Sequence, residues 1–196
     1  MCKFSEESRQ KLGNAVIYIA NHTEQLSKTK LLKLLFLMEE YMVKRYHVPF
    51  MGLPFEIWQA GPVAKDIFID LSDGPFLLKD FVKTEVQKDA TYIRAIKPFC
   101  DDEFSDCEME MMDEIIRKYG KKTAKQLVAE VHKEGSLWFN AAKKHGLLTA
   151  FNKGLCNNSD YTIDFSEELS DCAREDYKES LAIHQTANIL KAQEHV

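Results

Sequence analysis

The sequence has few of the residues and motifs from which common metal and catalytic sites are built. Its five cysteines include no Cys-x-x-Cys pair, and its six histidines stand singly, without a His-Glu-x-x-His helix. The patterns Gly-x-Gly-x-x-Gly, Gly-x-x-x-x-Gly-Lys and Gly-x-Ser-x-Gly are absent, so no phosphate cradle or serine nucleophile is visible. We therefore predict no metal, no cofactor and no catalytic residue.

Long apolar stretches are also missing. The run Leu34–Met38 is far shorter than the about 20 residues that a transmembrane helix needs. The charged residues of Met1–Glu7 are not followed by the apolar region of a secretory signal. An odd number of scattered cysteines is typical of a reducing compartment. We expect a cytoplasmic protein that is neither exported nor embedded in a membrane.

Positive charge is in deficit. The chain has 26 lysines and arginines against 31 acidic residues, a net charge of −5, which provides no overall attraction for nucleic-acid phosphates or anionic lipid. Nucleic acid is therefore not a predicted partner. The 196 residues are 45% hydrophobic, enough to bury a core without disulfides. We expect one domain over residues 1–196.

Apolar periodicity predicts a mainly α-helical protein of the α+β class, compact and with a small β element. Apolar residues recur at three and four positions after Ser5 and again after Ser27, each a suitable N-cap. The second of these helices is apolar on two sides and should be the buried centre. Lys30 and Lys33 interrupt it at its start, where we expect a solvated first turn in preference to a charge-binding role.

The middle of the chain has the composition of strands. Residues 53–60 are rich in aromatic side chains and should form an extended segment that stops at Gly61. Pro62 should then begin a helix, because proline lacks the N–H that is unpaired there. Residues 82–97 alternate apolar and polar side chains around a polar break, which predicts a two-stranded hairpin.

The second half of the chain has clear helix starts. Ser105 with Glu108, and Thr123 with Gln126, have the spacing of capping boxes, and Gly120 should be the C′ residue that ends the first of these helices.

Two more helices should follow. A short helix should begin at Ser136 and end near Gly146. Residues 160–196 should form a C-terminal helical extension, with a charged helix from about Asp171 whose inward residues are Tyr177, Leu181 and Leu190.

Several segments form an ordered set. They are Lys30-Leu31-Leu32-Lys33-Leu34-Leu35-Phe36, Trp58-Gln59-Ala60-Gly61-Pro62-Val63, Tyr119-Gly120-Lys121-Lys122-Thr123-Ala124, Val131-His132 and Leu137-Trp138. In this order they resemble the Panacea domain family, which includes SocA-like antitoxins and phage-associated GepA-like proteins. The likeness runs from Leu26 to Ala142. The family often has threonine before the histidine and proline before the tryptophan, where this chain has Val131 and Leu137.

The resemblance implies the antitoxin of a toxin–antitoxin system, a protein-binding module that neutralises a cognate toxin encoded nearby by direct contact. For SocA-like members it implies an adaptor that delivers the toxin to an ATP-dependent protease. We predict that the partner-binding region is formed by Trp58, Gln59, Gly61, Pro62, Val63, His132 and Trp138. Each of these residues could instead serve the fold alone, as buried aromatic and turn residues often do.

Two other classes of function stay open. The chain could be a hydrolase that uses an Asp/His pair, or that uses Cys107 or Cys100 with His132 brought near by folding, although a free cysteine is more often a small packed residue. It could bind nucleic acid, as antitoxins that repress their own genes do. Such proteins usually have a helix-turn-helix and a basic face, and neither is identifiable in this sequence.

Overall fold

Helices dominate the structure, a computed structural model that describes residues 4–72, 74–88 and 90–193. The prediction of a mainly α-helical protein with a small β element is confirmed. The helices are α1 (Glu6–His22), α2 (Lys28–Tyr46), α3 (Lys65–Asp70), α4 (Asp106–Tyr119), α5 (Ala124–Val131), α6 (Leu137–Lys144), α7 (Leu147–Asn152), the 3-10 helix η1 (Phe165–Glu168) and α8 (Asp171–Gln193). Two antiparallel sheets pair β1 (Glu56–Trp58) with β2 (Gly61–Val63), and β3 (Val82–Gln87) with β4 (Ala90–Ala95).

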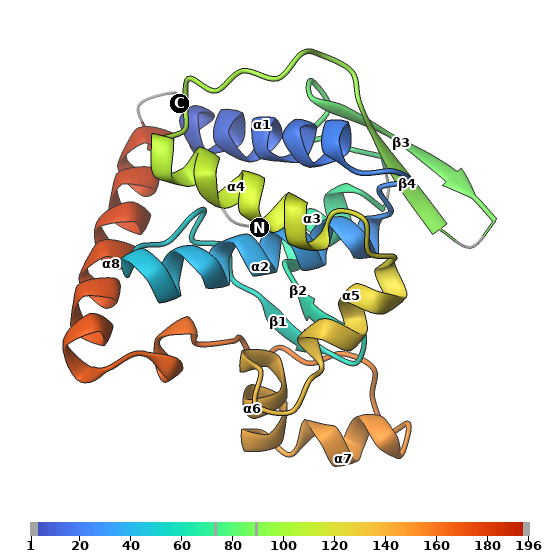
Figure 1. The fold of residues 1–196 in the computed structure, drawn as a ribbon, viewed down its shortest axis with the longest axis vertical. Helices are drawn as coiled ribbons and strands as arrows, with labels where there is room; N and C mark the ends of the chain where they lie inside the picture. Colours follow the sequence, from blue (N-terminus) through green and yellow to red (C-terminus); the bar gives the residue numbers. More distant parts are fainter. Residues whose placement is uncertain (1–3, 73, 89, 194–196) are drawn as a thin grey trace.

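Helix α2 is the centre of the molecule, as predicted (Figure 1). It packs against α1, α4 and α5, and against strand β2. Every residue from Lys30 to Glu39 is buried, because the helix is apolar on both sides and has neighbours on both. Ser27 is its N-cap, and the Ser27 hydroxyl accepts the Lys30 N–H at 3.3 Å.

The two lysines in the first turns of α2 are buried, so the prediction of a solvated first turn was wrong. Lys30 is 5% exposed and Lys33 is 1% exposed. The Lys33 Nζ donates to the backbone oxygen of Pro62 at 2.8 Å. The Lys30 Nζ donates to the backbone oxygens of Gly120 at 2.7 Å and Glu24 at 3.2 Å. These carbonyl groups replace the water that an ammonium group otherwise requires.

The turn before Gly61 joins two strands, and the prediction of a helix that begins at Pro62 was wrong. Pro62 lies in β2, opposite Ile57 of β1, and the helix begins later, at Lys65. The Ile57 N–H donates away from β2, to the Tyr161 oxygen at 2.9 Å. Ile57 and Pro62 therefore form a pair that exchanges no hydrogen bond, a position where proline costs the ladder nothing.

The β3–β4 hairpin and both helix caps were predicted correctly. Strands β3 and β4 pair along their full lengths. The Glu108 carboxylate accepts the Ser105 N–H at 2.9 Å, and Thr123 and Gln126 exchange both hydrogen bonds of a capping box.

Gly120 ends α4 in a different manner from the one predicted. It is the C-cap in a right-handed conformation, with φ −59°, and not a left-handed C′ residue. Glycine fits here because a Cβ atom would lie 2.6 Å from the backbone oxygen of Ile116.

The C-terminal third confirms two predicted helices and adds one. Helix α6 follows Ser136 and α8 begins at Asp171, as expected, whereas α7 was not predicted. Tyr177 is buried and Leu181 packs against the core, but Leu190 is 57% exposed, so its predicted inward position was wrong. Within the residues described, no helix combines the length and apolar content needed to cross a lipid bilayer.

Candidate functional site

The predicted partner-binding residues meet where the β1–β2 hairpin packs against α5 and α6. The Trp138 Nε1 donates to the backbone oxygen of Trp58 at 3.0 Å. The His132 ring stacks on Trp138, with ring centroids 3.8 Å apart and an interplanar angle of 8°. Folding thus brings Trp58 of the hairpin together with His132 and Trp138, which lie about 75 to 80 positions later in the chain. The family resemblance grouped these residues, but no local sequence pattern could place them together.

Lys33 of α2 packs against this junction, the region where the β1–β2 hairpin meets α5 and α6. Its ammonium group holds the backbone oxygen of Pro62, so α2 is bonded directly to the hairpin. Gly61 has a φ of +97°, and a Cβ atom there would lie 2.8 Å from the Lys33 Cε and 3.1 Å from the Val131 Cγ2. Glycine therefore serves two purposes at this position: it adopts a left-handed φ and it leaves room for the lysine.

The electrostatics of the junction are unusual for a protein interior. Burial lowers the pKa of Lys33 to about 7. Burial, and then the charge of Lys33, lower the pKa of His132 to about 4. The His132 Nε2 is buried and has no hydrogen-bond partner among the described residues. The Lys33 ammonium has three N–H groups and Pro62 accepts one of them, so the junction has polar capacity that a water molecule could satisfy.

The predicted binding residues differ in exposure. Gly61, Pro62, Val63 and Trp138 are buried, Trp58 and His132 are half-buried, and Gln59 is exposed. Even Gln59 is tied down, because its side chain donates to the Phe151 oxygen at 3.2 Å. The structure therefore assigns most of these residues contacts that hold the hairpin, and their part in partner binding stays a prediction.

Sequence reasoning missed three members of this region. The first is Lys33, which was predicted to be solvated but is bonded to Pro62. The other two are Phe68, which packs edge-on against Trp58 with ring centroids 5.0 Å apart, and Phe151, which stacks on Trp138 with ring centroids 6.3 Å apart. The signal available for Lys33 was a lysine within a run that is apolar on both sides of a helix. Nothing comparable singles out the two phenylalanines, which differ in no local feature from other core residues.

The geometry does not join Cys107 to His132, one of the pairs proposed for the alternative hydrolase site. The Cys107 Sγ lies 3.2 Å from the Ser105 Oγ at the start of α4, whereas His132 follows α5 and stacks on Trp138. In the part of the chain that the structure covers, no hydrogen bond links Cys107 to His132, as an activated nucleophile would require. Among the same residues, no three histidine, cysteine or acidic side chains are grouped to hold a metal ion.

Comparison with known families decides the assignment. The family described as "Antitoxin SocA-like, Panacea domain" matches residues 31–139. The chain belongs to this family. In this Panacea domain the match extends from α2 to the start of α6 and includes Lys33, Gly61, His132 and Trp138. No curated protein and no solved structure matches the chain.

We expect His132 to make the Panacea domain less stable as the pH falls from 6.5 to about 4. In this window the unfolded chain binds more protons at this histidine than the folded protein does. The free energy of unfolding therefore decreases as the pH is lowered. Glu39, whose pKa burial raises to about 7, acts in the opposite direction between its ordinary value of 4.5 and 7.

A comparison of the wild type with a His132→Gln variant isolates the histidine. Urea unfolding at pH 4, 5, 6 and 7 should show that any stability advantage of the wild type shrinks as the pH falls. A difference that stays constant across this range would contradict the lowered pKa.

Proposed function

We propose that this protein is an antitoxin that neutralises a cognate protein toxin by direct contact, without chemical change to the toxin. The observation that carries the proposal is the match of an antitoxin family to residues 31–139. These residues contain the β1–β2 hairpin and the α5–α6 turn, which the structure ties together through Trp138. Such a rigid junction suits a contact surface, because ordering a flexible surface on binding costs affinity.

The exposed part of this junction is small. Gln59 and Ala60 form the exposed tip of the hairpin, and Lys122 lies before α5 with its Nζ 2.6 Å from Glu130. A stable protein–protein complex buries about 1,200–2,000 Å² in total. The contact must therefore use more than one segment of the family match. Buried residues such as Pro62 and Trp138 would act by positioning the hairpin.

Co-expression tests the proposal. The product of the small open reading frame next to the gene should stop growth when it is expressed alone, and growth should return when this chain is co-expressed. The two proteins should elute together in size-exclusion chromatography, and the intact mass of the toxin should be unchanged. Gln59→Ala and Lys122→Ala should each weaken the complex partly, and the double variant should weaken it more. Lys178→Ala, an exposed lysine of α8 outside the family match, is the control.

Two results would replace this proposal. A toxin with altered mass and no co-eluting complex would make the chain an enzyme. Loss of the toxin that depends on an ATP-dependent host protease would make the chain an adaptor that delivers the toxin for degradation.

A further inference from the structure

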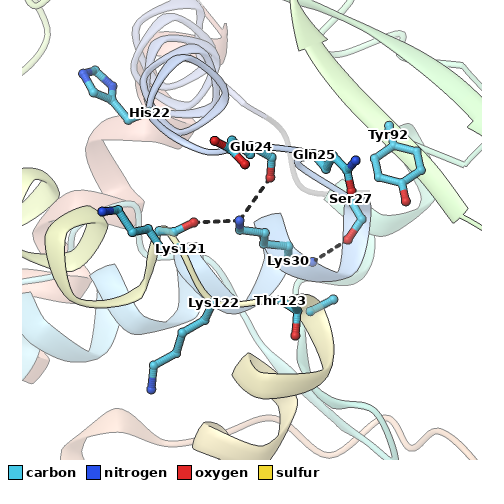
Figure 2. A pocket seen from close by; sticks show the side chains of 11 residues that line it. His22, Glu24, Gln25, Ser27, Lys30, Tyr92, Lys121, Lys122 and Thr123 are labelled. Atoms are coloured by element: carbon cyan, nitrogen blue, oxygen red, sulfur yellow. Dashed lines mark hydrogen bonds between the residues drawn. The ribbon is translucent and has the colours of Figure 1, made fainter.

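Two cavities in the described part of the chain differ in the charges that line them. One, of about 600 Å³, surrounds Lys30 and is bordered by the charged residues Glu24, Lys121 and Lys122. Figure 2 shows the Lys30 Nζ between the backbone oxygens of Glu24 and Gly120, which already accept hydrogen bonds from it. The other cavity, of about 520 Å³, lies between α8, η1 and the loop of residues 51–54.

The cavity beside α8 is uncharged. Among the described residues, no aspartate, glutamate, lysine or arginine lines it. Burial, and then the charge of Lys11, lower the pKa of His184, so this histidine is neutral at pH 7. Most of the lining is apolar and includes Met51, Leu53, Ile163, Phe165, Leu181 and Ile189. Such a lining disfavours a charged ligand, because a charge would lose its hydration there without gaining a partner.

The rest of the fold holds the walls of this cavity in place. The buried Glu39 carboxylate accepts the three N–H groups of residues 50–52 at 2.9 to 3.2 Å, which fixes the start of the loop. Phe165 packs within a cluster of core aromatic rings. Helix α8 is bonded to α1, because the Asn188 side-chain oxygen accepts from the Ser8 hydroxyl. A cavity with fixed walls loses little freedom when a ligand enters.

Tyr177 of α8 gives this cavity a hydrogen-bond donor. It lines the cavity and is only 4% exposed, yet its hydroxyl has no hydrogen-bond partner among the residues described. A buried tyrosine hydroxyl usually has a partner. Burial, and then the charges of Glu39 and Asp164, raise the pKa of Tyr177, so the hydroxyl keeps its proton at neutral pH. Negative charge on those two carboxyl groups also disfavours an anion beside it, so the matching group is an uncharged acceptor.

We propose that this cavity binds a small, uncharged and largely apolar molecule that has a carbonyl group as its hydrogen-bond acceptor. The Tyr177 hydroxyl donates to the carbonyl oxygen, and the apolar side chains of the 51–54 loop and α8 enclose the rest of the molecule. The volume lies within the range of about 300–1,000 Å³ that is typical of small-molecule sites. The cavity shares no residue with the predicted partner-binding region, so this proposal does not rest on toxin binding.

Titration calorimetry on the full-length protein tests the site with three probes of similar shape: acetophenone, ethylbenzene and benzoate. We expect acetophenone to bind most tightly, because it is uncharged and has a carbonyl acceptor. Ethylbenzene has no acceptor and should bind about three- to tenfold more weakly, the effect of one neutral hydrogen bond. Benzoate has acceptor oxygens but carries a charge into an uncharged cavity, so it should bind more weakly than either.

Tyr177→Phe isolates the hydroxyl, because the variant keeps the aromatic ring. It should weaken acetophenone binding about three- to tenfold and leave ethylbenzene binding unchanged. Urea unfolding should show no loss of stability, since the hydroxyl has no partner within the described protein. Tyr161→Phe is the matched control: this tyrosine is 52% exposed and does not line the cavity, so its loss should leave all three affinities unchanged.

Three results would overturn the proposal. The first is a wild type that does not bind acetophenone at millimolar concentration, or that binds benzoate as tightly. The second is a Tyr177→Phe variant that still prefers acetophenone to ethylbenzene, because the hydroxyl would then serve a water molecule and not the ligand. The third is unchanged acetophenone binding by Leu181→Trp, a variant that fills the cavity and whose folding circular dichroism checks, because the probe would then bind elsewhere.

Discussion

Replacing Gly61 with alanine should lower the free energy of unfolding by roughly 2–5 kcal/mol. Two costs combine at this position. The residue has a φ of +97°, which L-residues other than glycine adopt only with strain. The new Cβ would also lie 2.8 Å from the Lys33 Cε and 3.1 Å from Val131. Lys33 cannot move away freely, because it is 1% exposed and bonded to Pro62.

Gly135→Ala separates the two costs. Gly135 has a φ of +85°, and a Cβ atom there would have no neighbour within 4 Å. This variant should lose only the backbone part, about 1–2 kcal/mol. Urea unfolding of both variants at neutral pH measures the difference. Equal losses would contradict the close contact between Gly61 and Lys33.

Trp138→Ala should cost about 3–5 kcal/mol of stability, the usual range for a buried aromatic residue. The indole is 4% exposed and lies between two rings, His132 at 3.8 Å and Phe151 at 6.3 Å. Its N–H also holds the Trp58 oxygen. The substitution therefore opens a cavity and leaves a carbonyl group without its donor.

Trp138→Phe is the companion variant. It keeps an aromatic ring against His132 and removes the hydrogen bond to Trp58, so we expect a loss of about 1–3 kcal/mol, smaller than that of the alanine variant. Chemical denaturation gives both values. If Trp138→Ala were as stable as the wild type and yet lost the toxin, Trp138 would belong to the binding surface and not to the support of the hairpin.

Local signals were sufficient for most of the helices. The capping boxes that begin at Ser105 and Thr123 depend on atoms three residues apart, so the sequence contains the whole interaction. The β3–β4 hairpin was likewise predictable from alternation alone.

Predictions from local sequence patterns were wrong where contacts with a distant segment decide the structure. The preference of proline for a helix start was overridden at Pro62, because the hairpin pairs Pro62 with Ile57 while Ile57 bonds to the distant Tyr161. Leu190 was expected to face inward on α8, yet it is exposed. A stripe along one helix does not show how far the neighbouring elements extend.

The candidate site shows the same division. Resemblance grouped Trp58, Gly61, His132 and Trp138, and the structure brings them to one junction. The sequence left open whether they face a partner or the core, because a tryptophan at the end of a strand or the start of a helix has the same local pattern in both cases.

The sequence by itself determined the helix-rich class, the helix caps and the place of Lys30 and Lys33 at the start of the central helix. Only the tertiary structure decided what these lysines do. Their carbonyl partners at Gly120 and Pro62 lie 90 and 29 residues away. The buried Glu39 carboxylate similarly accepts the N–H groups of residues 50–52. A charged side chain can enter the core only where distant backbone groups are held ready to replace water, and that condition is set when the whole chain folds.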